Sequence, residues 1–156
     1  MTGDNDNYGV AKGQLEYYLS TKTKNPLTLG LRGGGAVSHG GAIPWYRLPT
    51  LGDSNGLRGY FQNRFAGESV AYLNAEIRYQ LFEKYTSLFP IKVGIKAFYD
   101  RGKVFIEENE VMEDWRSGYG FGFYIVPLTR GLTISLAAGF SEEEDIYPVI
   151  SIGTNF

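Results

Sequence analysis

The sequence predicts an all-β protein: an antiparallel transmembrane β-barrel, of which this chain carries about seven or eight strands. Three observations lead to this prediction. Apolar and polar side chains alternate with the two-residue period of strands through successive segments. No apolar run approaches the roughly 20 residues that a membrane helix needs, whereas a membrane strand needs only about 9–11. Short connections alternate with mostly longer ones, as periplasmic turns alternate with extracellular loops in outer-membrane barrels.

The composition narrows the possible functions. The 156 residues suffice for one domain, 1–156, and the absence of cysteine excludes disulfides and cysteine-based zinc sites. A net charge of −2 gives no basic field for nucleic acid. Met1–Asn7 is polar and acidic, without the features of a signal peptide, so we expect a mature chain or a fragment of an exported protein.

Each predicted strand has one apolar face and one polar or glycine-rich face. The predicted strands are 8–20, 26–37, 68–82, 89–105, 116–128, 131–141 and 146–156. We expect the apolar faces to contact lipid, with these residues among them: Phe121, Leu132, Ile134, Leu136, Ile150, Ile152 and Phe156. A charge at Ser135 or Ser151, on the other face, should be tolerated. Bacterial barrels have even strand numbers, so either a strand near Met1–Asn7 or strands from elsewhere would complete the ring.

The longest connection, 38–67, is expected to be an ordered loop on the extracellular side, with the C-terminus periplasmic. It contains large apolar residues, which predict that it folds into the barrel: Trp45, Tyr46, Leu48, Leu51, Tyr60 and Phe61. A soluble β-sandwich or lipocalin-like barrel would also alternate. Tyrosines near the strand ends and the aromatic C-terminal residue favour the membrane barrel.

Several motifs resemble one family in their order and spacing. Leu57-Arg58-Gly59-Tyr60 resembles the VRGF/VRGY signature of the sixth extracellular loop in the BamA, TamA and FhaC superfamily of assembly and secretion barrels, the bacterial surface antigen family. The strand with Glu76, the segment with Asp100 and Gly102, and residues 116–140 are similar to the strands that follow in that family. The ending with Ile152, Gly153 and Phe156 resembles its C-terminal β-signal. Leu57 replaces the usual valine. The POTRA domains and most of the first half of the family's sixteen-stranded barrel are not in the chain.

The resemblance implies how the loop is held. In the family the loop returns into the lumen, where its arginine pairs with carboxylates of the wall, which here implies Arg58 with Glu76 and Asp100. Both carboxylates have the parity of the polar face, and a turn centred near Leu88 would place them directly opposite each other.

The resemblance also implies a function: insertion, assembly or translocation of proteins at the bacterial outer membrane, without enzymatic activity or cofactor. The expected partners are outer-membrane lipid, lipopolysaccharide, and client or partner strands that bind at a seam along 147–156. A missing N-terminal half or an oligomer would complete the barrel. The alternative is a membrane anchor or pore for a fused patatin-like or phosphatase domain.

Other short motifs do not indicate catalytic or metal sites. The segment 38–41 is similar to an esterase oxyanion loop, but there is no G-x-S-x-G elbow and His39 is the only histidine. Gly118–Gly122 is not followed by a helix, as a dinucleotide site requires. Glycines there would instead let a packed loop approach the wall. The acidic run 142–145 is interpreted as a solvated loop rather than a calcium site.

Overall fold

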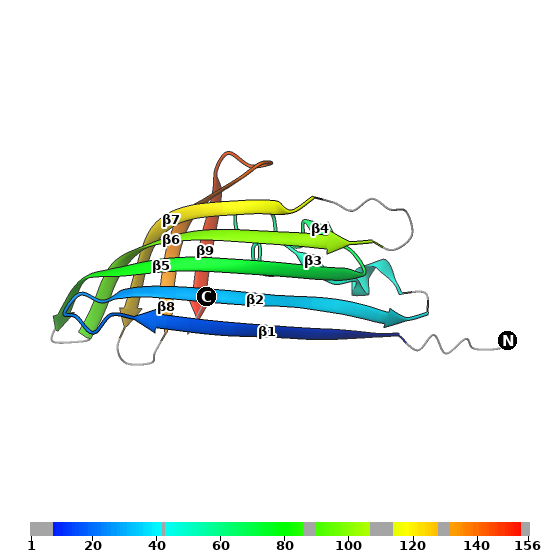
Figure 1. Ribbon diagram of the computed structural model, residues 1–156. Helices are drawn as coiled ribbons and strands as arrows, with labels where there is room; N and C mark the ends of the chain where they lie inside the picture. The colour runs from blue at the N-terminus through cyan, green and yellow to red at the C-terminus, as the bar shows by residue number, and fades with distance from the viewer. Residues whose placement is uncertain (1–7, 42, 86–89, 107–113, 128–131, 154–156) are drawn as a thin grey trace.

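The computed structural model describes residues 8–41, 43–85, 90–106, 114–127 and 132–153. One seven-stranded antiparallel sheet dominates it, in the order β1-β2-β5-β6-β7-β8-β9 (Figure 1). Its strands are β1 (Tyr8–Ser20), β2 (Leu27–Gly40), β5 (Ser69–Tyr85), β6 (Pro90–Phe105), β7 (Arg116–Pro127), β8 (Thr133–Ser141) and β9 (Tyr147–Gly153). The long loop contains a short 3₁₀ helix, η1 (Trp45–Arg47), and a small pair of strands, β3 (Thr50–Leu51) and β4 (Phe65–Ala66). In the described part of the chain, no helix is long and apolar enough to cross a bilayer.

The predicted fold class is confirmed: the sheet is a partial antiparallel barrel, and its two edges, β1 and β9, are not joined. Two strands end later than predicted: β5 continues to Tyr85 and β2 to Gly40. β2 pairs with β1 as far as Gly40, so residues 38–40 belong to the strand and not to the loop. The proposed additional strand near the N-terminus falls in residues 1–7, outside the described residues.

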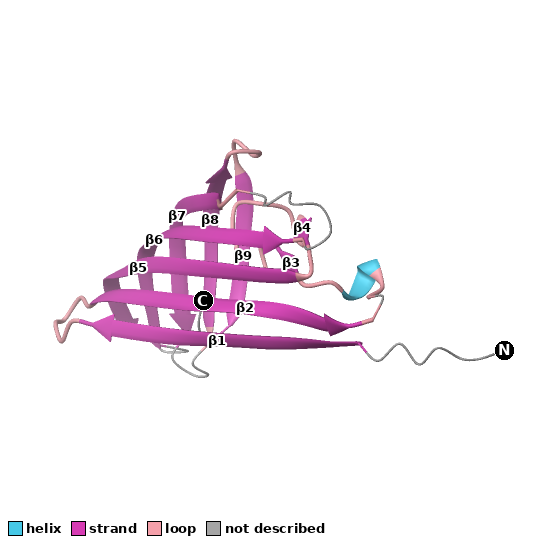
Figure 2. Ribbon diagram, turned by 45° about the vertical axis from the view of Figure 1, so that its right-hand side comes forward, coloured by secondary structure: helices cyan, strands magenta, loops and turns pink. Residues whose placement is uncertain are grey.

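The sheet curves into an open part of a barrel, called the half-pipe below. In both views β8 and β9 lie behind β5 and β6 (Figures 1 and 2). Phe98 of β6 consequently shares a buried cluster with Ala137 of β8 and Val149 of β9. Glycines on the inner face of β7 permit this curvature. A β-carbon at Gly122 would lie 2.1 Å from the carbonyl oxygen of Leu136 on the neighbouring strand, so only glycine fits there.

The polarity of the two sheet faces is the reverse of that in a soluble barrel, since polar side chains point inward and apolar side chains point outward. The inner face buries charged and polar side chains: Asn74, Glu76, Gln80, Lys96, Asp100, Thr133 and Ser135. The outer face exposes aliphatic and aromatic ones, including predicted residues Phe121, Ile134, Leu136, Ile150 and Ile152. Leu132 is half-buried just before β8, and Phe156 lies outside the described residues. An apolar surface of this extent is typical of a wall that contacts lipid.

The expected tolerance of a charge at Ser135 is wrong. Ser135 is 3% exposed and its hydroxyl contacts Lys96 and Ser151, so it belongs to a packed interior rather than a water-filled lumen. The curl of β8 over β6 causes this burial, and strand parity alone does not reveal it.

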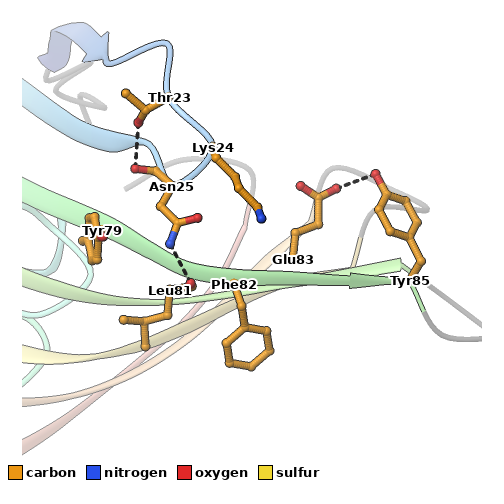
Figure 3. Close-up of a pocket in the computed structure, with 8 residues that line it drawn as sticks. All are labelled: Thr23, Lys24, Asn25, Tyr79, Leu81, Phe82, Glu83 and Tyr85. Carbon is orange, nitrogen blue, oxygen red and sulfur yellow. Dashed lines mark hydrogen bonds between the residues drawn. The ribbon is translucent and has the colours of Figure 1, made fainter.

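The register between β5 and β6 corrects the predicted pairing of the carboxylates. Near the connection Glu83 pairs with Lys92, one residue away from the predicted register, and the bulge between Gln80 and Phe82 shifts the pairing by one residue more, so that Glu76 pairs with Phe98 and Asp100 pairs with Asn74. The two carboxylates are therefore diagonal neighbours and not direct partners. The carbonyl oxygen of Leu81, at the bulge, accepts a 2.8 Å hydrogen bond from the Asn25 side chain (Figure 3).

Candidate functional site

The part of the long loop from Leu51 to Tyr60 lies against the inner face of the sheet. Leu51, Leu57 and Tyr60 are at most 1% exposed. They share a core cluster with residues of β2, β5 and β6, among them Ala36, Val70 and Val104. Gly102 on β6 leaves room for this packing, because a β-carbon there would lie 2.9 Å from Leu51. The loop thus forms a hydrophobic core together with the few apolar side chains of the inner wall.

The prediction that the large apolar residues of the loop fold into the half-pipe is wrong for three aromatic residues. Trp45 and Tyr46 are 81% and 63% exposed, and Phe61 is 54% exposed. Trp45 and Tyr46 belong to η1, which lies beyond the strand ends, so the wall offers them no surface to pack against (Figure 2). Phe61 packs edge-on against Tyr147 of β9, with ring centroids 5.3 Å apart.

Arg58 is the centre of a buried ionic cluster. Its backbone N and its Nε donate to Oδ2 of Asp100 at 3.0 and 2.8 Å, and its Nη2 donates to Oδ1 at 2.8 Å. Its Nη1 donates to Oε2 of Glu76. The side chains of Arg58, Glu76 and Asp100 are 8%, 1% and 0% exposed. Such charge-assisted and bidentate bonds are strong and geometrically demanding.

Two further wall residues, to which the sequence analysis gave no role, complete the seat of this motif. The guanidinium of Arg58 lies over the ring of Phe98, 4.0 Å from its centroid. The Asn74 side chain donates to the carbonyl oxygen of Gly56 at 2.8 Å. Asn74 and Phe98 occupy the same two rows of the β5–β6 pair as the carboxylates. The alternation along the strand could have identified Phe98, because this aromatic residue has the same parity as Lys96 and Asp100.

Glycines allow the loop backbone to reach the wall. Gly59 has a φ of +91°, in the left-handed region that favours glycine, and a β-carbon there would lie 2.9 Å from the carbonyl oxygen of Phe140. On β7, a β-carbon at Gly118 would lie 2.0 Å from the carbonyl oxygen of Arg58. Beside them, the Tyr60 hydroxyl donates to the carbonyl oxygen of Ser117 at 3.1 Å. Backbone therefore approaches backbone on both sides of the motif.

The charges around the motif nearly balance. Glu76 also accepts a bond from Arg78, and its Oε2 lies 3.7 Å from Nζ of Lys96. Burial alone would lower the pKa of Arg58, but the hydrogen bonds and negative charges of Asp100 and Glu76 outweigh it and raise the pKa. In the loop, burial raises the pKa of Asp53, whose Oδ1 is buried without a hydrogen-bond partner. The cluster is suited to holding a loop in place, since its cations and carboxylates are mutually paired.

The other predicted site residues lie apart from this cluster. Ile152 is on the outer face at the end of β9, and Gly153 pairs with Thr133. Two carboxylates of the acidic turn form ion pairs with arginines: Glu143 with Arg64 at 2.7 Å and Glu142 with Arg116 at 3.3 Å. Among the described residues, no group of histidine, aspartate and glutamate side chains could hold a metal ion.

Comparisons with known proteins agree with the motifs. A family model described as the Omp85 superfamily domain matches residues 1–149. No curated protein and no solved structure matches the chain.

Proposed function

This chain belongs to the Omp85 superfamily of outer-membrane barrels that assemble or translocate proteins, and from that premise we propose that it accepts client or partner β-strands at its C-terminal edge strand, β9. The observation that carries this proposal is the chemistry of that edge. In the described sheet β9 is the last strand, and Tyr147–Gly153 contains no charged residue. Natural sheets usually protect an open edge with charges, proline or a covering segment, and of the first two devices β9 has only Pro148, near its start.

The single proline of β9 indicates which backbone groups are available. Pro148 has no N–H and can lie in the strand only if that position faces the open edge and not β8. Backbone groups alternate sides along a strand. The N–H and C=O groups of Ile150 and Ile152, which have the parity of Pro148, therefore point to the open edge. These backbone groups can form hydrogen bonds with an added strand along the stretch from Ile150 to the end of β9.

The direction of the two edges limits what can close the barrel. β1 and β9 are the first and last of seven alternating strands, so they run parallel to each other. A second copy inserted in the same orientation would also present parallel edges. An antiparallel closure needs an odd number of additional strands, and we propose that these come from outside the described residues, as a missing N-terminal barrel half would supply them.

We further propose that the long loop lies on the extracellular side, that β9 ends at the periplasmic side, and that the outer wall contacts membrane lipid and lipopolysaccharide. The loop packs at the end of the half-pipe where β2 ends and β5 begins (Figure 1), while the tight β1–β2 turn lies at the other end. This separation of long and short connections is typical of outer-membrane barrels.

Site-specific photo-crosslinking in the intact protein in native outer membranes tests the strand-acceptance proposal. A photo-reactive residue at Ile150 should crosslink to newly synthesised barrel proteins, whereas one at Phe123, on the outer face of β7 between two paired strands, should not. Ile152→Pro removes one edge donor and should abolish the crosslinks, while Ile152→Leu retains the donor and should preserve them.

Crosslinks that persist with Ile152→Pro, or that arise equally from Phe123, would contradict the proposal. Crosslinks to neither site, together with loss of a hydrolase domain from the membrane when β9 is disrupted, would favour the anchor function instead.

A further inference from the structure

A chain of polar contacts leads from the Arg58 cluster to the edge strand. Oε2 of Glu76, which accepts the Arg58 bond, lies 3.7 Å from Nζ of Lys96. Lys96 donates to Oγ of Ser135 on β8 at 2.8 Å, and Ser135 shares a 2.5 Å hydrogen bond with Ser151 on β9. These contacts cross the sheet from β5 to β9.

The chain of contacts is buried, and within the described part of the chain Lys96 contacts Glu76 and Ser135. Lys96 is 4% and Ser135 is 3% exposed. Lys96 pairs in register with Gly122, which has no side chain, so the lysine stem passes β7 and reaches β8. A buried ammonium group needs several hydrogen-bond partners to offset its lost hydration. Lys96 is therefore held by Glu76 on one side and by Ser135 on the other.

The last contact depends on the register of the edge strand. Ser135 and Ser151 are direct partners in the β8–β9 pairing. A slip by one residue would turn the apolar face of β9 inward. A slip by two would place Val149 or Gly153 opposite Ser135, and neither has a hydroxyl. The hydrogen bond can form only in the native register.

We propose that Lys96, Ser135 and Ser151 are positioning residues: they link the seated Arg58 loop to β9 and hold the edge strand in register. The inference deepens the proposed function, because the register of β9 would set which backbone groups meet an incoming strand. An edge strand has backbone hydrogen bonds to one neighbour only, so its register is weakly fixed. A side-chain contact within the strand, such as that of Ser151, therefore helps to hold the register. The contact of Phe61 with Tyr147 joins the loop to the start of β9, but it is a contact between two rings, and Phe61 is 54% exposed.

Disulfide formation can report this register, since the chain has no cysteine of its own. Leu136→Cys with Ile150→Cys places two cysteines at directly paired, outward-facing positions and reports the native register. Leu136→Cys with Ile152→Cys reports a slip by two residues. Both pairs are measured in the intact protein in isolated outer membranes, with no client added.

The decisive comparison is between Ser135→Thr and Ser135→Val, which have nearly the same shape and differ in the hydroxyl. Valine should increase the slipped crosslink several-fold, while threonine should keep the native pattern. If the Ser135 variants do not reach the membrane, the same pair of changes at Ser151 gives the same comparison. Equal crosslinking with threonine and valine would overturn the proposal.

Two further variants test the link to the loop. Lys96→Met should increase slipping, whereas Lys92→Met, on the same face of β6 with its own ion pair to Glu83, should not. Arg58→Ala should increase slipping, and adding Ser135→Val should increase it no further. Additive effects would mean that β9 is positioned independently of the loop. Because no client is used, failure of client crosslinking at Ile150 would refute the proposed function without affecting this result.

Discussion

Asp100 accepts three hydrogen bonds from the single residue Arg58: one from the backbone N–H and two from the guanidinium. Both oxygens of the carboxylate are used, and Asp100 is fully buried. The backbone bond fixes the position of the loop chain, and the forked bonds fix the orientation of the side chain. A lysine could replace the charge but not this geometry.

Arg58→Ala should lower the free energy of unfolding by about 3–5 kcal/mol, because it leaves two buried carboxylates without their main partner. Arg58→Lys should recover only part of this loss. Denaturant unfolding of the intact protein in detergent measures both. A loss below about 1 kcal/mol for the alanine variant would contradict the prediction, since exposed ion pairs lose that little.

The three charged residues should behave as one network. Combining Arg58→Ala with Glu76→Gln and Asp100→Asn should cost less than the sum of the separate changes, because the neutral amides no longer need a cation. Coupled contacts of this kind deviate from additivity by about 0.5–3 kcal/mol. The same unfolding measurements across the full set of variants give the coupling, and strict additivity would refute it.

Gly118→Ala should displace the loop, since the added carbon would lie 2.0 Å from the carbonyl oxygen of Arg58. Overpacking of this kind costs about 1–3 kcal/mol, and the loop should become more sensitive to added protease. Gly13→Ala is the matched control in β1, because a β-carbon there meets no atom within 4 Å. Equal protection of the loop in both variants would argue against the close approach.

The outer face should reject charge. Leu136 is 58% exposed on that face, and Leu136→Arg should cost about 2–4 kcal/mol of folding free energy in lipid vesicles. Gln14→Arg, at an exposed inner-face position of β1, should cost about 1 kcal/mol or less. Similar losses at the two sites would mean that the outer face is not in contact with lipid.

Asp53 should make the free energy of unfolding depend on pH, in a direction that follows from its pKa. Burial raises its pKa above 3.8, so the folded state binds the proton more tightly than the unfolded state. This contribution favours folding below pH 3.8 and is lost as the pH rises through the raised folded-state value. Asp53→Asn should therefore stabilise the protein at pH 7. Unfolding measured from pH 3 to pH 7 should show this gain shrinking as the pH falls, whereas a gain that is constant with pH would contradict the assignment.

The strands and their faces could be predicted from the sequence because alternation is a local property. The predicted start of β1 at Tyr8 and the ends of β6 at Phe105 and β8 at Ser141 agree with the structure. The register between β5 and β6 could not be predicted in the same way. A one-residue offset already present at the Glu83–Lys92 pair and one additional residue at the bulge near Leu81 together moved Glu76 from opposite Asp100 to a diagonal position, and alternation within one strand does not give its pairing with the next.

The sequence by itself determined which residues share a face, which loop carries the arginine motif, and which carboxylates have the parity to meet it. Only the tertiary structure decided which of these side chains contact one another. The roll of the sheet brought Phe98 beneath Arg58 and Lys96 to Ser135, and it left Trp45 and Tyr46 outside the half-pipe. The physical reason is that parity assigns a side chain to a face, whereas its neighbours across several strands depend on curvature, bulges and the path of a loop, which many distant residues set together.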